Sequence, residues 1–303
     1  MSGVISTANF PKLLWPGLNA VWGMNYKDPD KYYTDLFDVV SSDMQYEEDQ
    51  EVVGFGLVPQ KPQGQATTYD SHQQGFTTRY THVAYGMGLI ITHEELMDNL
   101  YLKRGTARAK ALARSFRITK EIVAANVYNR AGTSGYTGGD GQTLLSTAHT
   151  SIAGSWQNTP TVAADLSEAA LEDMLILVRK AVDSRGLKIG LTARSLVIPV
   201  ELEFEATRIL KSSLQNDTAN NAVNAVRAMG MIPEGIKANP FLTDTNSWFL
   251  RTDAPEGMKL FQREEATFAQ DGDFDTGNLK YKGYERYSVG WTDPRALYGT
   301  LGA

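Results

Sequence analysis

The sequence predicts an α+β protein, and three observations carry this prediction. From Asn239 to the C-terminus, short strand-like runs alternate with turn-forming Asp, Gly, Asn and Pro. Near residue 65 a polar, glutamine-rich segment separates two extended runs, which predicts a long hairpin. The stretch from His93 to Ala131 contains no proline and predicts an unusually long helix.

The composition is that of a folded protein without disulfides or membrane-spanning segments. In 303 residues, hydrophobic residues make up 42% and charged residues 21%, proportions typical of a folded protein. A net charge of −6 argues against a free-standing nucleic-acid-binding protein. The absence of cysteine excludes disulfides, zinc–thiolate clusters and thiol nucleophiles. The N-terminus has no basic start and no apolar core, and no apolar run is long enough to cross a bilayer. We therefore expect no signal peptide and no membrane partner, and a protein made in a cytoplasm.

Residues 1–45 are expected to form an arm. Pro11, Pro16 and Pro29 interrupt this segment repeatedly. It nevertheless carries large aromatic side chains, namely Phe10, Trp15, Trp22, Tyr26, Tyr32 and Tyr33. Because a broken segment cannot bury these rings by itself, we expect the arm to lie along its own domain or a neighbouring subunit.

Residues 46–92 are expected to form an extended loop built as a long β-hairpin. Its first strand is predicted in the run at 52–59 and its second in the run at 76–92. The polar tip between them is punctuated by Pro59, Pro62 and Gly64. A long hairpin with so little core is marginal in isolation. We expect it to be stabilised by lying on a partner.

The predicted helix from His93 begins with a capping box formed by Thr92 and Glu95, and Gly105 is a candidate bend. Its middle is basic, with Lys103, Arg104, Arg108, Lys110, Arg114, Arg117 and Lys120. The preceding chain is acidic, with Asp28, Asp30, Asp35, Asp38, Asp43, Glu47, Glu48, Asp49 and Glu51. Three interpretations stay open: a solvated face, a contact with the acidic segment of the same or another subunit, or a surface facing DNA without sequence preference.

A compact α/β unit is predicted over residues 160–255. Ser167 is the expected N-cap of a helix, and Gly186 lies in the turn that follows it. A strand ending at Pro199, a helix at 200–214, a short helix near 220–231 and a strand near 232–242 follow in order. Alternating strands and helices of this kind favour one compact domain.

No motif in the chain predicts catalysis. Asp271, Asp273 and Asp275 have the spacing of a calcium loop, but Thr276 and Lys282 stand where an EF-hand needs Gly and Glu, so a solvated loop is favoured. The glycine-rich segment 131–141 lacks the Lys and Ser/Thr of a phosphate-binding loop and is expected to be a flexible connection. The four histidines have no ligand spacing. We therefore expect no enzyme, with no catalytic, cofactor-binding or metal-binding residues.

Several segments carry a resemblance to a known family. They are GQTLLSTAH at 141–149, SLVIPVELEFEATRIL at 195–210, NPFLTDTNSWFL at 239–250 and ERYSVGWTDPRALYG at 285–299. Together with the order of arm, hairpin, long helix and α/β unit, they resemble major capsid proteins of tailed bacteriophages with the Hong Kong 97-type fold. The similarity is greatest to the Mu-like head subunit branch, and it covers nearly the whole chain.

This resemblance implies a division of the chain. Residues 1–45 correspond to an N-terminal arm and 46–92 to the extended loop. Residues 93–159 correspond to the spine helix with part of a peripheral domain, 160–255 to an axial domain, and 256–303 to returning strands that complete the peripheral domain. Subunits of the family form hexamers and pentamers that close into an icosahedral shell around double-stranded DNA, assembled in the host cytoplasm. The implied partners are other copies of the chain, portal, scaffolding and decoration proteins, and packaged DNA held by non-specific contacts.

Two features bear on how far the resemblance extends. No long assembly segment precedes the arm, and Met1 favours a separate scaffolding protein. Some family members join subunits through a Lys–Asn isopeptide bond, and Lys61 lies near the loop tip, although residue type alone does not establish that chemistry. The alternatives are an encapsulin-like nanocompartment shell and an α/β metabolic enzyme. The enzyme is disfavoured because a third of the chain is arm and hairpin.

Overall fold

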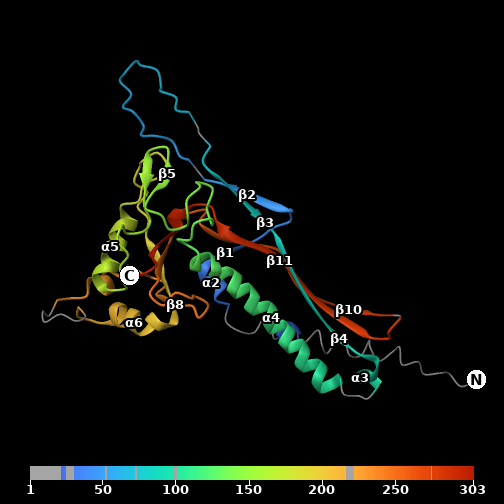
Figure 1. The fold of residues 1–303 in the computed structure, drawn as a ribbon. Helices are drawn as coiled ribbons and strands as arrows, with labels where there is room; N and C mark the ends of the chain where they lie inside the picture. Colours follow the sequence, from blue (N-terminus) through green and yellow to red (C-terminus); the bar gives the residue numbers. More distant parts are fainter. Residues whose placement is uncertain are drawn as a thin grey trace, which may run out of the picture.

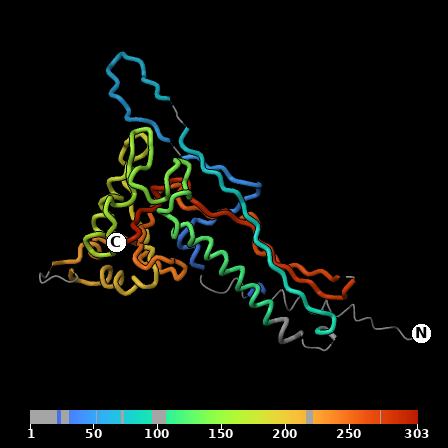
Figure 2. Tube along the Cα trace, viewed as in Figure 1, coloured from blue at the N-terminus to red at the C-terminus, as the bar shows by residue number. Residues whose placement is uncertain are grey.

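The computed structural model describes residues 22–24, 31–51, 53–71, 74–97, 101–215, 222–273 and 275–303. Figure 1 shows an elongated sheet with a long helix beside it, a smaller α/β unit at one end, and a loop that projects away from both. The tube in Figure 2 shows a strand from the first third of the chain (cyan) running beside strands from its C-terminal end (red) along the elongated part. The architecture is therefore α+β, as predicted.

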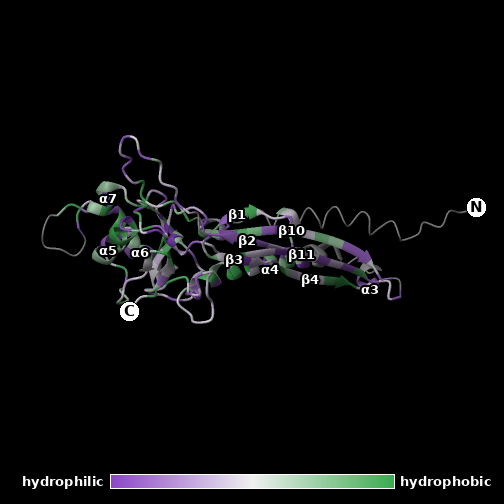
Figure 3. Ribbon diagram, turned by 90° about the horizontal axis from the view of Figure 1, so that it is seen from above, coloured by the Kyte–Doolittle hydropathy of each residue, from purple (hydrophilic) through white to green (hydrophobic). Residues whose placement is uncertain are grey.

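The elongated part is a four-stranded sheet with the order β1-β10-β11-β4. Its strands are β1 (Asp38–Ser41), β4 (Val83–Ile91), β10 (Met258–Gly272) and β11 (Leu279–Trp291). β10 and β11 form a long antiparallel hairpin, β4 adds antiparallel to β11, and β1 runs parallel to β10. Figure 3 shows α4 (Tyr101–Asn129) lying along this sheet. β11 alternates accordingly, with Tyr281 and Tyr287 buried and Lys280 and Lys282 exposed.

Two helices are described within the range predicted as one continuous helix. α3 (His93–Met97) precedes α4, and residues 98–100 lie outside the described residues. Thr92 acts as the predicted cap, because its Oγ1 accepts a hydrogen bond from the Glu95 backbone N–H at 3.3 Å. α4 ends at Asn129 rather than Ala131. Among the described residues, no helix is long and apolar enough to cross a membrane.

The arm contributes aromatic side chains to the subunit's own core. The Trp22 ring stacks on Phe268 at 5.0 Å and meets Phe116 edge-on at 5.4 Å. α2 (Tyr33–Leu36) lies against α4, where the Tyr128 hydroxyl donates to the Leu36 carbonyl at 3.0 Å. At these positions the arm therefore lies along its own subunit. The sequence had left open whether it lies there or on a neighbouring subunit. Residues 1–21, including Phe10 and Trp15, and residues 25–30 lie outside the described residues.

The α/β unit contains a second four-stranded sheet, ordered β12-β9-β7-β8. Its strands are β7 (Ala193–Ile198), β8 (Ile236–Ala238), β9 (Trp248–Thr252) and β12 (Leu297–Thr300). Its helices are α5 (Glu168–Arg179), α6 (Glu203–Lys211), α7 (Ala225–Met229) and the 3₁₀ turns η2 (Val200–Leu202) and η3 (Pro294–Ala296). The predicted cap is confirmed, because Ser167 Oγ accepts from the Ala170 N–H at 3.2 Å. β12 shows that the last residues of the chain complete this sheet.

The predicted hairpin differs from the structure in its pairing. The paired strands are β2 (Tyr46–Gln50) and β3 (Thr77–Thr81), which we call the ribbon. The first predicted strand at 52–59 is wrong, because residues 53–59 form no strand. Gly54, Gly56 and Pro59 weaken strand pairing there. The run at 76–92 is split at His82: β3, before it, pairs with β2, and β4, after it, pairs with β11.

Candidate assembly surfaces

The loop formed by residues 53–71, called here the projecting loop, exposes apolar side chains on both of its limbs. Exposure is 62% for Phe55, 82% for Leu57, 93% for Val58 and 92% for Tyr69. The two limbs are held together where the Gly56 N–H donates to Asp70 Oδ2 at 2.9 Å, and this bond keeps the pKa of Asp70 below its usual range. Figure 1 shows the loop reaching beyond β5 (His149–Ser151). Exposed apolar side chains this numerous on a thin loop are typical of a contact surface.

Both ends of the projecting loop, which we call its feet (Glu51 and Ser71), are held by hydrogen bonds or ion pairs to residues 184–185 and to Arg295. At the N-terminal foot, Glu51 Oε1 lies 2.8 Å from Arg295 Nη1 and also accepts from the Ser184 hydroxyl. At the C-terminal foot, an Arg185 guanidinium nitrogen donates to the Ser71 carbonyl at 2.6 Å. The subunit therefore sets the direction of the loop, although its limbs are exposed.

Arg295 is the centre of this anchor. Its side chain is 3% exposed and donates from Nε to the Val182 carbonyl at 2.7 Å. The guanidinium stacks over the Trp156 ring, 4.4 Å from the ring centre, and contacts Asp293. Burial raises the pKa of Asp293, although the adjacent guanidinium opposes this shift. A buried cation held by this many acceptors makes the loop base rigid.

The acidic segment pairs with cations of the strands and of η3. Its ion pairs are Asp35–Lys237 at 2.8 Å, Asp38–Arg251 at 2.7 Å, Asp43–Arg263 at 3.7 Å, Glu48–Arg79 at 3.7 Å, Asp49–Lys259 at 2.6 Å and Glu51–Arg295 at 2.8 Å. Asp28 and Asp30 lie outside the described residues. The side chains of Lys103 and Arg104 also lie outside the described part. Among the described side chains of one subunit, the acidic segment forms no ion pair with the basic helix, and a contact with the helix of another subunit stays a prediction.

The basic helix has two different faces. Lys120 is buried against the sheet, where its Nζ lies 2.7 Å from Glu285 Oε1. Arg108 pairs with Glu95 at 2.8 Å. Lys110 and Arg114 are exposed and form no ion pair with the described residues. Lys120 therefore belongs to the core, and only part of the predicted basic surface faces outward.

Glu121 joins the arm to α4 and gives a prediction for pH dependence. Its Oε2 accepts from the Tyr33 backbone N–H at 2.8 Å, and burial raises the pKa of this carboxyl to about 7. Because the folded-state pKa lies above the ordinary value, the folded state holds this proton more tightly than the unfolded state. The resulting stabilisation is complete below pH 4.5, the ordinary pKa, and is lost as the pH rises through about 7.

Replacing Glu121 by Gln keeps the acceptor and removes the titration. We expect the free energy of unfolding of the wild type, relative to E121Q, to fall by up to about 3 kcal/mol between pH 4.5 and 8. Urea unfolding of the two proteins across this pH range measures the difference. Parallel stability profiles would show that Glu121 does not carry the proposed proton linkage.

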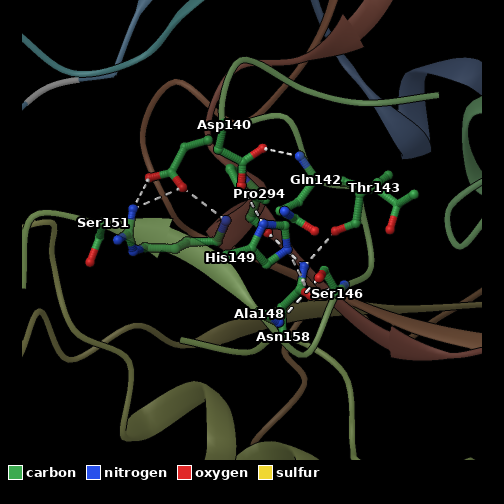
Figure 4. Close-up of polar contacts among 12 residues, drawn as sticks. Asp140, Gln142, Thr143, Ser146, Ala148, His149, Ser151, Asn158 and Pro294 are labelled. Carbon is green, nitrogen blue, oxygen red and sulfur yellow. Dashed lines mark hydrogen bonds and ion pairs between the residues drawn. The ribbon is translucent and has the colours of Figure 1, made fainter. Parts of the chain in front are cut away.

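A buried polar network surrounds His149 (Figure 4), and no motif in the sequence indicated it. His149 Nδ1 lies 2.6 Å from Asp140 Oδ2, and its Nε2 lies 3.1 Å from Asn158 Oδ1. The Asn158 amide nitrogen donates to the carbonyls of Leu144 at 2.7 Å, Pro294 at 3.2 Å and Leu297 at 2.9 Å. His149 has no solvent exposure. The network therefore ties residues 140–158 to η3 and β12.

Asp140 and His149 are residue types found in catalytic triads, but the second ring nitrogen of His149 contacts the Asn158 amide rather than a hydroxyl. The Ser151 hydroxyl donates instead to the Gly154 carbonyl at 2.7 Å. The expected flexible glycine segment is also packed, because a Cβ at Gly139 would lie 2.9 Å from Thr78 Oγ1 and 3.0 Å from the Thr77 carbonyl oxygen. Only glycine allows this close approach to β3. The motif at 141–149 thus has a structural role that follows from its tertiary partners.

Asn158→Ala should destabilise the subunit more than other asparagine truncations. It would leave three buried carbonyls without their shared donor and the Ser146 N–H without its 3.0 Å acceptor. We expect the free energy of unfolding to fall by about 2–3 kcal/mol. Asn126→Ala is the control, because Asn126 is only partly buried and its side chain contacts Asn129 at 3.5 Å. Equal losses in the two variants would contradict the role of the network.

The acidic loop after β10 forms an ordinary ion pair. Asp273 Oδ2 lies 2.7 Å from Lys280 Nζ, and this contact lowers the pKa of Asp273. Within the described residues, no group of three or more His, Asp or Glu side chains could hold a metal ion. Asp273 is thus engaged by a lysine, and the solvated-loop interpretation of Asp271, Asp273 and Asp275 stays a prediction.

Comparison with solved structures relates this fold to viral shells. The chain is similar to a virus-like particle protein from Pyrococcus furiosus, with 11% identity, 94% of this chain and 98% of that chain covered, and a TM-score of 0.56. The capsid of a native GTA particle aligns with 12% identity, 91% of each chain covered and a TM-score of 0.57. The procapsid of bacteriophage JBD30 aligns over 98% of this chain and 76% of that chain, with 12% identity and a TM-score of 0.52.

These likenesses establish the fold, which is the Hong Kong 97-type capsid fold predicted from the sequence. They do not by themselves separate phage shells from other shells, because the Pyrococcus particle is equally similar. No curated protein sequence matches the chain. The sequence profile of the phage capsid protein family, however, matches residues 75–299. Since that match covers most of the 303 residues, the chain belongs to the phage capsid protein family.

Proposed function

We propose that this chain is the major capsid protein of a tailed bacteriophage and that its subunits form hexamers and pentamers of an icosahedral shell. One observation supports a specific contact between subunits: the four exposed apolar side chains on the limbs of the projecting loop. A loop anchored at both feet and apolar on its exposed limbs is suited to a contact with a neighbouring subunit. Rings of such contacts are heterologous and close by rotation.

The proposed division of labour follows the division expected from the sequence. Residues 1–45 act as the arm and 46–92 as the extended loop. Residues 93–159 and 256–303 together form the peripheral domain. The proximity of α4 to the β10–β11 hairpin supports this grouping. Residues 160–255 form the axial domain, a proposal supported by the separate core around α5, β7 and β9. One refinement is that β12 completes the sheet of the axial unit.

The remaining partners are also proposals. Scaffolding, portal and decoration proteins, and packaged double-stranded DNA held without sequence preference, are the partners that a tailed-phage shell requires. The exposed Lys110 and Arg114 on α4 are suited to phosphate contacts. We propose assembly in the host cytoplasm and a structural rather than enzymatic role. The family match favours the phage shell over an encapsulin-like nanocompartment or a metabolic enzyme.

Electron microscopy of the purified chain, expressed alone and with candidate scaffolding partners, tests the proposal. We expect closed shells or capsomer rings of five and six subunits. Sedimentation of the same samples gives the fraction assembled. A stable monomer at high concentration under every condition would overturn it, and closed particles with a protein cargo would favour the nanocompartment.

A further inference from the structure

His82 occupies the junction between the ribbon and the main sheet. It is the residue between β3 and β4, at which the chain stops pairing with β2 and begins to pair with β11. Its side chain is 5% exposed. Both ring nitrogens are engaged, with Nε2 lying 2.9 Å from Ser42 Oγ and Nδ1 lying 3.0 Å from Ser288 Oγ. The ring therefore connects Ser42, the residue after β1, to Ser288 in β11.

The direction of these hydrogen bonds follows from Glu47, on β2. The Ser42 hydroxyl donates to Glu47 Oε1 at 2.6 Å, because a carboxylate only accepts. Ser42 Oγ must then accept from His82, so Nε2 carries the hydrogen. In the neutral ring, Nδ1 is left with its lone pair and accepts from the Ser288 hydroxyl. One chain of hydrogen bonds thus runs from β11 through His82 and Ser42 to β2.

A second proton on His82 would disturb this chain. Nδ1 would become a donor, so the Ser288 hydroxyl could no longer donate to the ring and would have to turn its hydrogen away and accept from Nδ1. The new charge would also lie in a buried position. Burial is the main cause that lowers the pKa of His82 from 6.5, and Arg286 on β11 and Arg263 on β10 lower it further. Glu47 acts in the opposite direction and favours the charged ring.

Other groups near the junction do not supply a strong counter-charge. Asp43 lies 3.7 Å from Arg263 and is fully exposed, so it only partly screens that cation. Glu48, the next acid on β2, pairs with Arg79 on β3 at 3.7 Å. The junction is therefore built for a neutral imidazole.

We propose that His82 is a pH-sensitive pin that fastens the ribbon to the main sheet when neutral and releases it when protonated. Because the folded-state pKa is lowered, the stabilisation is fully present above pH 6.5 and is lost as the pH falls from 6.5 through the folded-state pKa. The ribbon carries the projecting loop, so acid would loosen the loop's mounting. The inference concerns the single subunit and does not depend on shell formation.

Hydrogen–deuterium exchange of the unassembled subunit tests the pin. We expect protection of the amides at 46–50 and 77–81, corrected for the intrinsic pH dependence of exchange, to fall as the pH decreases from 7.5 to 5. The fall should reach at most about tenfold per pH unit, the limit for one proton. In His82→Gln the side chain is neutral at every pH, so this dependence should disappear. His93→Gln, at an exposed histidine in α3, is the matched control and should retain it.

Two further variants test the electrostatics while keeping the imidazole. Glu47→Gln removes the charge that favours imidazolium, so the folded-state pKa should fall and the loss of protection should extend to lower pH. Arg286→Gln removes an opposing cation, so the loss should become smaller. These opposite shifts remain measurable if H82Q fails to fold. Unchanged pH dependence in H82Q, or shifts of the same sign in the two charge variants, would overturn the proposal.

Discussion

Deleting residues 57–69, which include the exposed Leu57, Val58 and Tyr69, and closing the gap with two glycines is expected to abolish shell formation while leaving the subunit folded. The deleted residues are exposed and bury no side chain in the subunit. Surface changes of this kind usually alter stability by less than about 0.5 kcal/mol. The melting temperature should therefore change by less than about 2 °C. Electron microscopy and sedimentation measure assembly, and circular dichroism measures the melt.

A matched pair of variants separates the apolar limbs from the polar tip. Replacing Phe55, Leu57, Val58 and Tyr69 together by serine removes the exposed apolar surface and should prevent assembly. Replacing Lys61, Gln63 and Gln65 by alanine should preserve it, because polar rim contacts usually contribute little. The second variant also removes the candidate cross-linking lysine. Normal shell yield from the deletion would show that the loop makes no essential contact, and loss of its cooperative melt would place the loop in the subunit core.

The largest expected loss of subunit stability comes from Lys120→Met. Lys120 is 5% exposed and Glu285 1% exposed, and their charged atoms lie 2.7 Å apart. Lys120 also donates to the Gln262 side chain and lies over the rings of Tyr33 and Tyr287. Replacing Lys120 takes the paired cation away from the buried Glu285 carboxylate, and breaking a buried ion pair in this way typically costs about 3–5 kcal/mol. Urea unfolding of the unassembled subunit measures the change.

The control for this variant lies on the same helix. Lys110→Met replaces an exposed lysine that has no ion pair among the described residues, so it should change the free energy of unfolding by less than about 0.5 kcal/mol. Adding Glu285→Gln to Lys120→Met should recover part of the loss, because a neutral amide is less costly to bury than a carboxylate. If the two lysine variants are equally stable, the buried pair does not support the contact between α4 and β11.

The sequence predicted correctly those features that depend on residues close together in the chain. Thr92 and Ser167 cap helices as expected, because a cap requires only a hydroxyl and a free N–H nearby in sequence. The order of elements and the α+β class also followed from hydrophobic periodicity and turn residues. The motifs at 141–149 and 285–299 indicated the family. Their resemblance held over most of the chain, which is why the fold and the capsid family could be predicted together.

Periodicity did not predict which strands pair. The run at 76–92 looks continuous in sequence, yet it divides at His82 because its two halves have different partners, β2 and β11. β1 pairs with β10 although more than two hundred residues separate them. Hydrogen bonds of a strand are satisfied by any suitable neighbour, so the sequence of one strand does not specify the other. The glycine interruptions at 54 and 56 were the available signal against the first predicted strand.

The sequence by itself determined the helix caps, the element order, the polar loop tip and the family. Only the tertiary structure decided that Trp22 and Tyr33 lie in the subunit's own core, that Lys120 is buried, and that Asp140, His149 and Asn158 form one network. A lysine in a basic run is usually solvated. Lys120 departs from that rule because Glu285, brought close by the β10–β11 hairpin, compensates its charge. Burial and pairing depend on groups far apart in the chain, and folding alone brings them together.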